Sequence, residues 1–290
     1  MENPCELGLS RRLIQMEIGL KIIQAINNIS TENLTLSVQV SLNGFSFILV
    51  DSISNEIISL GCENFKTKVT PDFLLAKLVD EFETNEKLNL KFKKVKLIHC
   101  NNMLTLVPSA LFSEGNLADY LKYNTKLYKS DFITYDVIKN EDIILVYIPY
   151  ANVNNFIFDK FGSFEYNHSS TIFIDKISQL RKNSINPELI VNVNKTYFDL
   201  IAFNRNKIIL YNRFNYETKE DFIYYILFTA EQINFNPENF KCILTGDIDL
   251  EDDLYKITYK FIRFIELLPS NIINQSSTKS RNHFILKNSF

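Results

Sequence analysis

Apolar and polar positions over the first third of the chain predict three strands, a helix and a further strand. Residues 34–42 alternate between apolar and polar side chains, and Asn43-Gly44 then supplies the chemistry of a tight turn. Thr70-Pro71 is a typical helix start, because Thr caps the first turn and Pro fits the first helical position. The expected elements are strands at 34–42, 45–50, 57–60 and 95–100 and a helix at 70–82.

The same order of elements recurs later in the chain. Strands are expected at 189–193, 198–203 and 208–210, a helix begins after Thr218, and a strand follows at 240–244. The spacings agree as well, since 30 residues separate Val40 from Thr70 and 25 separate Val193 from Thr218. We interpret this as an internal duplication and expect two similar α/β domains, each with a mixed sheet. Val38 and Val191 should then lie on corresponding central strands.

The remaining segments set the expected domain limits. Between the two copies, helices at 113–125 and 153–161 and a strand at 143–148 indicate a small subdomain inserted in the first domain. Residues 183–187 are polar, contain a Pro and form the best candidate for a linker. The predicted organisation is an N-terminal extension at 1–33, a first domain at 34–186 and a second domain with a C-terminal tail at 187–290.

The N-terminal extension contains a predicted amphipathic helix at residues 10–29. Its apolar residues share one helical face: Ile14, Ile18, Ile22, Ala25 and Ile29. We interpret this helix as packed on the body of the protein. A membrane-surface anchor is the alternative, which is disfavoured because the basic residues are few and mixed with acids.

The C-terminal part of the chain predicts a helix and a last strand. Apolar residues keep helical spacing from Leu254 to Leu268, and the acids at 251–253 suit the dipole of a helix start. The run at 284–286 indicates a short strand after a polar linker. We expect a set of side chains to be buried on inward strand positions or on the apolar stripe of this helix: Phe198, Ile201, Ile243, Leu244, Ile257 and Phe261.

Composition places the chain among ordinary folded proteins. Of its 290 residues, 46% are hydrophobic, and 31 basic residues against 34 acidic ones give a net charge of -3. No nucleic acid partner is expected, because a surface for the phosphate backbone needs an excess of basic residues. No apolar run approaches the ~20 residues of a membrane span and no leader pattern is present, so the cytoplasm is the expected compartment. The widely spaced cysteines indicate neither a disulfide framework nor a zinc site.

Common catalytic motifs are missing from the sequence. There is no G-x-S-x-G elbow, no G-K-[ST] phosphate loop and no G-x-G-x-x-G fingerprint. None of the three histidines has a second His or Cys at metal-ligand spacing, so we interpret them as structural. A lysine cluster at 91–96 favours protection of an open sheet edge, with RNA or DNA binding as the alternative.

The duplicated order of elements resembles the actin-like ATPases, in which two ribonuclease-H-like domains enclose a nucleotide cleft. In that superfamily, the sequence of the second phosphate loop is Asp, an apolar residue, a run of glycines, Thr, an aromatic residue and a second Asp. Here the interval from Asn192 to Asp199 reads N-V-N-K-T-Y-F-D. The first loop, normally Asp, apolar, Gly, reads Gln39-Val40-Ser41, and the adenosine-side strand keeps only Gly246 of its usual Gly-Gly.

Two closer resemblances refine this assignment. The region from Val107 past Pro149 is similar to that of pilus-assembly and cell-division relatives, which insert a small subdomain there. Residues 36–47 and 203–246 resemble a Bacteroidota domain family of unknown function with a degenerate actin-like fold. That resemblance covers roughly Leu34 to Leu268 and implies a fold but no reaction.

The departures from the actin-like pattern determine the expected chemistry. Glycines let the backbone approach phosphates, and carboxylates hold magnesium through water. Side chains at 194–196 would crowd the phosphates, and two acids are replaced by amides, so we expect neither ATP nor magnesium and no catalytic residue. Asp199 opens a strand, a position typical of a turn or solvent residue. The resemblance leaves these candidates for a vestigial cleft: Gln39, Asn43, Asn192, Asn194, Lys195, Asp199, Gly246 and Asp247.

Two functions from different classes remain open. The leading hypothesis is a catalytically inactive actin-like protein that acts as an interaction or scaffold module, with a protein partner or a further copy of itself. The alternative is a nucleotide-binding protein or weak ATPase that uses Asp199, Asp247 and a rearranged phosphate loop.

Overall fold

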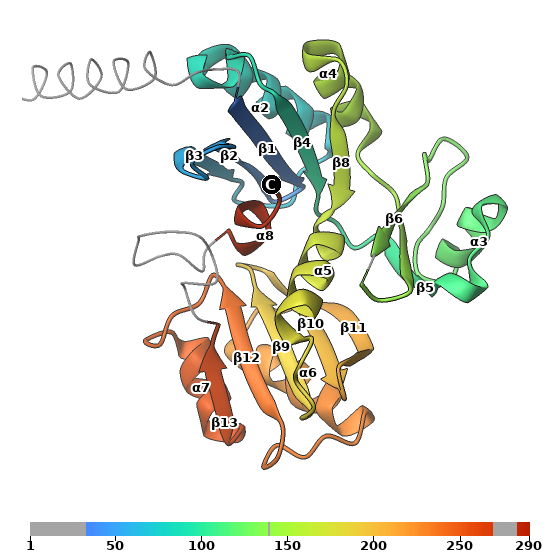
Figure 1. Cartoon of the computed structure of the whole chain (residues 1–290), viewed down its shortest axis with the longest axis vertical. Coiled ribbons are helices and arrows are strands. Elements are labelled where there is room, and N and C mark those ends of the chain that lie inside the picture. The colour runs from blue at the N-terminus through green and yellow to red at the C-terminus, as the bar shows by residue number, and fades with distance from the viewer. Residues whose placement is uncertain (1–32, 139, 269–282) are drawn as a thin grey trace, which may run out of the picture.

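The chain forms two mixed five-stranded sheets with the same strand order (Figure 1), as seen in a computed structural model that describes residues 33–138, 140–268 and 283–290. In each sheet, three antiparallel strands are followed by two parallel ones. The first sheet has the order β3 (Ile57–Asn64), β2 (Gly44–Asp51), β1 (Leu34–Ser41), β4 (Lys94–His99), β8 (Glu165–His168). The second has the order β11 (Lys207–Asn215), β10 (Tyr197–Asn204), β9 (Glu188–Val193), β12 (Lys241–Gly246), β13 (Phe264–Leu267). The predicted duplication is confirmed, with Val38 and Val191 on the equivalent central strands β1 and β9.

Two helices cover the outer face of each sheet. The first sheet packs against α2 (Pro71–Thr84) and α4 (Ala151–Phe161), and the second against α6 (Lys219–Gln232) and α7 (Asp253–Phe261). The start of α2 is as predicted, because the Thr70 side chain accepts a hydrogen bond from the backbone N–H of Phe73. A reciprocal capping box between Thr218 and Asp221 begins α6.

The inserted subdomain has a small core of its own. Its sheet has the order β5 (Leu104–Pro108), β7 (Ile143–Tyr147), β6 (Thr134–Ile138), and α3 (Leu117–Leu121) packs against it. The helix expected at 113–125 is therefore shorter than predicted and is preceded by 3₁₀ turns at Ser109–Leu111 and Glu114–Asn116. A further 3₁₀ turn, Glu86–Asn89, follows α2.

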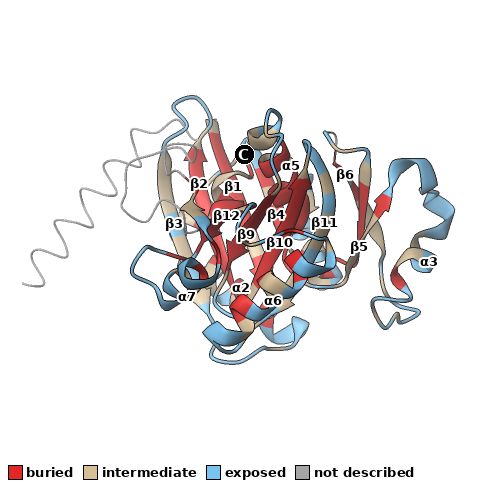
Figure 2. Ribbon diagram, turned by 90° about the horizontal axis from the view of Figure 1, so that it is seen from below, coloured by how far each residue is buried: buried red, intermediate tan, exposed pale blue. Residues whose placement is uncertain are grey.

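The inner faces of the two sheets meet around α5 (Ser169–Arg181) and α8 (Phe284–Lys287), which lie between the domains (Figure 1). Sequence patterns did not predict α5, and the expected strand at 284–286 is wrong, because this run forms one helical turn against β1, β2 and α5. We call the resulting cluster the interdomain core. Its main members are Ile48, Val50, Ile98, Phe173, Ile174, Ile177, Ile190, Ile201, Ile243, Phe284, Ile285 and Leu286. Figure 2 shows these buried strands at the middle of the molecule.

The predicted helix from Leu254 to Leu268 is only partly correct. It ends at Phe261, and residues 264–267 turn into β13, which pairs in parallel with β12. Phe261 consequently is 47% exposed rather than buried, and Ile257 is partly buried. The other four side chains expected in the core are buried: Phe198, Ile201, Ile243 and Leu244.

The lysine-rich strand β4 does not protect an edge. It lies inside the first sheet, between β1 and β8, and Lys94 forms an ion pair with Glu165 of β8 at 2.9 Å. Within the described residues, no helix has the length and apolar character needed to cross a membrane. The amphipathic helix predicted at 10–29 lies outside the described residues.

Candidate site between the two domains

Two equivalent hairpin turns, one from each domain, meet at the mouth of the interdomain cleft. The β1–β2 turn is fixed at Gly44, whose φ of 146° and whose contact with the Glu63 carbonyl leave no space for a side chain. The β9–β10 turn is closed by a hydrogen bond from the Asn194 N–H to the Tyr197 carbonyl, 2.9 Å. Across the cleft, the Asn43 side-chain amide donates to the Thr196 hydroxyl at 3.0 Å. The resemblance to actin-like ATPases implies that these turns correspond to the two phosphate loops, and here they contact each other.

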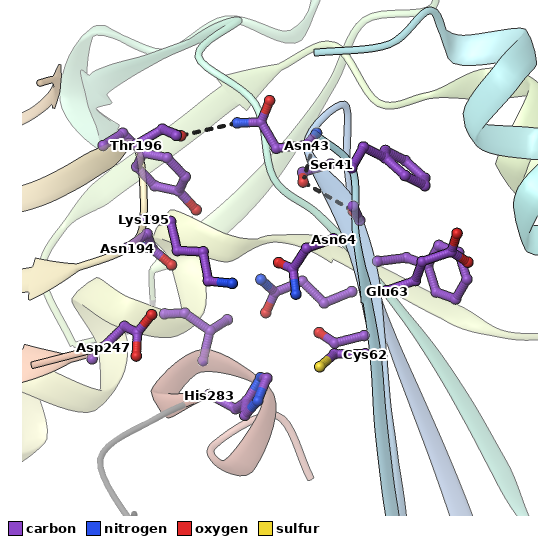
Figure 3. A pocket seen from close by; sticks show the side chains of 18 of the residues that line it. Ser41, Asn43, Cys62, Glu63, Asn64, Asn194, Lys195, Thr196, Asp247 and His283 are labelled. Atoms are coloured by element: carbon purple, nitrogen blue, oxygen red, sulfur yellow. Dashed lines mark hydrogen bonds between the residues drawn. The ribbon is translucent and has the colours of Figure 1, made fainter. Parts of the chain in front are cut away.

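A pocket of about 440 Å³ lies beside this contact (Figure 3). In Figure 3, Lys195 and Asp247 reach into it from the second domain, Cys62 and Asn64 face them from β3, and His283 comes from the start of α8. Of the eight residues singled out in the sequence, seven line this pocket: Gln39, Asn43, Asn192, Asn194, Lys195, Gly246 and Asp247. Asp199 is not among its lining residues.

The pocket carries a mixed charge. Lys66, Lys68 and Lys195 line it together with Glu63 and Asp247. Burial and the neighbouring ammonium of Lys287 lower the pKa of His283, while Asp247 opposes that shift. Sequence patterns gave no sign of a role for the lysines of the loop after β3, because nothing in the local pattern indicates that this loop reaches the second domain.

Gly246 has a structural explanation that is independent of any nucleotide. Its φ is 87°, and a Cβ atom there would lie 2.2 Å from the Val193 carbonyl oxygen. The backbone of β12 approaches β9 this closely because the N–H of Asp247 donates to the same Val193 carbonyl at 2.8 Å. The retained glycine therefore satisfies the local sheet geometry.

Asp199 is buried and fully engaged, contrary to the expectation of a turn or solvent residue. Its carboxylate accepts hydrogen bonds from Arg213 Nε at 2.7 Å and from the Tyr211 hydroxyl at 2.8 Å, and Asn192 contributes a third at 3.3 Å. The side chains of Asp199 and Arg213 are only 2% and 8% exposed. Asp199 faces Arg213 directly in the β10–β11 hairpin, so the pair is set by strand register.

Arg213 also joins the second domain to the first. Its guanidinium donates to the Asn101 carbonyl at 2.6 Å and to the Ser169 hydroxyl at 3.2 Å, at the ends of β4 and β8. The same group stacks over the Tyr197 ring at 4.5 Å, and the Tyr197 hydroxyl lies 2.8 Å from the Cys100 thiol. Burial alone lowers the pKa of Arg213, but the Asp199 carboxylate outweighs it and holds that pKa well above its ordinary value. The guanidinium is thus a permanent cation between the domains.

Two buried histidines lie at the same junction, and each is held in one neutral form. His99 Nδ1 accepts from the Tyr150 N–H at 3.2 Å, so its Nε2–H donates to Asn154 at 2.8 Å. His168 likewise accepts at Nδ1 from the Ser170 N–H and donates from Nε2 to the Asn101 carbonyl. Burial lowers the pKa of His99 to about 4 and that of His168 well below its ordinary value. Both have the buried and hydrogen-bonded surroundings that are typical of structural histidines.

The donors for a metal ion are not gathered at this site. Among the residues that the structure describes, no group of three or more His, Cys, Asp or Glu side chains could hold a metal. Gln39 and Asn192, where the resemblance to actin-like ATPases implies acids, present neutral amides, and the Asp199 carboxylate forms an ion pair with Arg213. The arrangement is polar and suited to hydrogen bonding, without the paired carboxylates of a magnesium site.

The duplicated sheets, the crossover helices and the interdomain cleft define a protein of the actin-like ATPase fold. The chain belongs to the DUF3822 family of proteins of unknown function, whose sequence profile matches residues 23–265.

Solved structures confirm the fold. A crystal structure from Bacteroides thetaiotaomicron, of a protein with actin-like ATPase fold and unknown function, is similar with a TM-score of 0.77 and 22% identity, over 89% of this chain and 96% of that one. A chain of the PilM-PilN type IV pilus biogenesis complex is similar with a TM-score of 0.59 and 8% identity, over 87% of this chain and 96% of that one. Among curated proteins, no sequence matches the chain significantly.

Proposed function

We propose that this protein is a catalytically inactive actin-like protein that works as an interaction or scaffold module. The observation that carries the proposal is the ion pair between Asp199 and Arg213. Of the three positions where actin-like ATPases place carboxylates, Gln39 and Asn192 have lost the charge and Asp199 is neutralised by a buried guanidinium. A magnesium ion would have to displace Arg213 from a carboxylate that is almost inaccessible to water.

The contact between the two hairpin turns supports the same conclusion. The Asn43 amide and the Thr196 hydroxyl are hydrogen-bonded across the place where phosphates would lie between the turns. A bound triphosphate would require this contact to open. Because Arg213 also bonds to the first domain, opening would cost the buried hydrogen bonds of its guanidinium as well.

A role in an assembly is supported by the fold's occurrence in the PilM-PilN complex of type IV pilus biogenesis. That structure is a complex between proteins, and we carry over to this chain only the general role of binding another polypeptide.

The test is calorimetric titration of the full chain with ATP and Mg²⁺, together with a phosphate-release assay. We expect no binding heat at nucleotide concentrations up to about 1 mM and no hydrolysis above a buffer blank. The variant Asn192→Asp should behave the same way, because Arg213 still holds Asp199 and side chains still fill the turn. Saturable ATP binding, or phosphate release that Asn192→Asp increases, would contradict the proposal.

A nucleotide-binding protein or weak ATPase with a rearranged site is the second candidate. The observation that favours it is the 440 Å³ pocket lined by Lys66, Lys68 and Lys195. In the same titration, ATP binding that disappears in Lys195→Gln but persists in a surface control, Lys256→Gln, would favour this candidate over the scaffold.

A further inference from the structure

The outer helices of the second domain expose an unusual number of aromatic rings. On α6, Tyr224 and Phe228 are 58% and 43% exposed and stack on each other one helical turn apart. On the neighbouring α7, Tyr259 is 67% exposed and stacks on Tyr255, and Phe261 is also exposed. The two helices pack against each other on the same side of the second sheet. Tyr259 and Phe261 are two residues apart on α7, so their rings point to different sides of that helix. We therefore call the outward side of α6, which carries Tyr224 and Phe228, the aromatic face.

The aromatic face has the composition of a binding surface. Tyr and Phe are enriched where proteins bind each other, whereas single exposed apolar residues need no explanation. The rings of Tyr224 and Phe228 hold each other in place, so little side-chain freedom remains to be lost on binding. Figure 2 shows that the outer sides of α6 and α7 are not covered by any described part of the chain.

The surroundings of the aromatic face are acidic. By helical spacing, Glu220 and Glu231 lie on the same side of α6 as Tyr224 and Phe228, and both glutamates are exposed. The lysine of that helix, Lys219, forms an ion pair with Asp253. An apolar ligand for this surface should therefore carry positive charge beside its apolar residues.

A segment of this same chain has that chemistry. Residues 10–29 combine an apolar stripe with Arg11, Arg12 and Lys21 against a single acid, Glu17. The stripe at Ile14, Ile18, Ile22, Ala25 and Ile29 recurs at helical spacing, which is the pattern of a helix that lies in an apolar groove. Its net charge is opposite to that of the glutamates on the outward side of α6.

The segment cannot reach the aromatic face of its own copy along its full length. Residues 30–33 span at most about 14 Å, so Ile29 stays near the start of β1. From there, the eight residues of β1 extend about 26 Å to the cleft, and α6 begins only on the far side of it. Figure 1 shows α6 and the start of β1 at opposite ends of the two-domain body. Only a second molecule can bring the whole stripe to this face.

We propose that the aromatic face on α6 binds residues 10–29 of a second copy of this chain. The proposal names the partner within the interaction role proposed above, and it is independent of whether the cleft binds nucleotide. Because donor segment and acceptor face are different surfaces, the contact is heterologous and links copies head to tail, in a ring or an open chain.

Association of the full chain is measured by sedimentation over about a hundredfold range of concentration. We expect concentration-dependent self-association that weakens by about tenfold or more in Tyr224→Ser/Phe228→Ser, and equally in Ile18→Ser/Ile22→Ser. All four changes leave the described core intact. The matched control is Ile53→Ser, which removes a 73% exposed apolar side chain from the β2–β3 turn of the first domain and should leave association unchanged.

A labelled peptide of residues 10–29 separates the segment from the rest of the chain. It should bind full-length Ile18→Ser/Ile22→Ser protein, whose own segment is disabled, and should lose that binding when Tyr224→Ser/Phe228→Ser is added. A peptide with Arg11→Glu/Arg12→Glu should bind more weakly and with less dependence on salt.

Several results would overturn the proposal. These are a chain that stays monomeric at every concentration, association that survives Tyr224→Ser/Phe228→Ser, and a peptide that binds vesicles containing anionic lipid but not the protein. The last result would make the segment a membrane-surface anchor. None of them bears on the titration with ATP, so the two proposals can fail separately.

Discussion

Arg213 supplies a buried positive charge at the junction of the two domains. It places a positive charge against Asp199 and bonds to backbone and hydroxyl oxygens of the first domain. A guanidinium is always charged and is part of the chain, so the junction between the domains carries a fixed cation. A side chain of the second domain thus joins the two domains through hydrogen bonds.

Removing Arg213 should destabilise the protein strongly. Arg213→Met leaves the Asp199 carboxylate buried without its partner, and we expect a loss of about 3–5 kcal/mol in the free energy of unfolding. Adding Asp199→Asn should restore part of it, because the neutral amide no longer needs a cation. Urea unfolding followed by circular dichroism measures the double-mutant cycle. Strictly additive losses would mean that the two side chains are not coupled.

The buried histidines predict how stability depends on pH. The folded-state pKa of His99, about 4, lies below its unfolded value near 6.5, so the unfolded chain binds a proton that the folded chain refuses. The contribution of His99 to the free energy of unfolding is therefore fully present well above pH 6.5 and is lost as the pH falls below that value. The slope of this loss approaches about 1.4 kcal/mol per pH unit. His168 contributes in the same direction, whereas Asp136, whose pKa is raised by burial, opposes it.

The variant His99→Gln isolates this contribution. It should be less stable than the original protein at neutral pH, yet its stability should fall less steeply, by up to about 1.4 kcal/mol per pH unit, between about pH 6.5 and 5. Because His168 and Asp136 are the same in both proteins, their contributions cancel in the comparison. Urea unfolding across this pH range gives both slopes, and equal slopes would show that His99 becomes protonated in the folded protein.

At the scale of elements, the predictions were correct where residues close in the sequence determine the structure by themselves. The caps at Thr70 and Thr218 begin their helices as expected, and Gly162 ends α4 with a φ of 73°. The failures are elements whose structure depends on distant partners. Residues 264–267 keep helical spacing but pair with β12, and residues 284–286 resemble a strand but form a helical turn packed in the interdomain core.

The helix α5 shows a different limit of sequence patterns. It is buried on most sides, and its first turn hides Ser169, Ser170 and Thr171, so no apolar stripe separates it from its polar positions. Its start is capped by the side chain of His168, a residue that is not a usual helix cap. A helix that is surrounded by two domains needs no amphipathic pattern, and for that reason the periodicity gave no signal.

The end of α7 should tolerate substitution. Phe261 is 47% exposed, and Phe261→Ala is expected to cost less than about 1 kcal/mol. Phe222, buried in α6 against Phe198, is the comparison: Phe222→Ala should cost about 3–5 kcal/mol. Both losses are measured by urea unfolding. A loss at Phe261 as large as that at Phe222 would place its ring in the core.

The short helix α8 should contribute much more than its length implies. Leu286 is fully buried in the interdomain core, so Leu286→Ala is expected to cost about 2–5 kcal/mol. Phe290, which is 41% exposed, provides the control on the same segment, and Phe290→Ala should change stability by less than about 1 kcal/mol. Similar effects of the two substitutions would indicate that α8 is not docked in solution.

At the scale of the whole molecule, the duplication could be predicted from the sequence. The two copies share the order and spacing of their elements, although their individual residues differ. Seven of the candidate residues line one pocket, because equivalent turns of a duplicated fold face each other across its axis. Arg213 was missed. A signal existed, because the turn at Asn204–Asn206 places Arg213 close to Asp199 in the hairpin, but the bulge at Ala202 shifts the register by one residue.

The position of α8 also determines the order in which parts of the protein can fold during its synthesis. Each sheet and its outer helices are built from a continuous stretch of chain, and can fold as that stretch leaves the ribosome. The inner faces of both sheets, however, stay partly uncovered until residues 284–286 have been synthesised, because these residues fill the interdomain core. The nascent protein therefore passes through a stage with two formed domains and an exposed apolar seam between them. At that stage chaperones, or a neighbouring nascent chain, compete with α8 for the same surface.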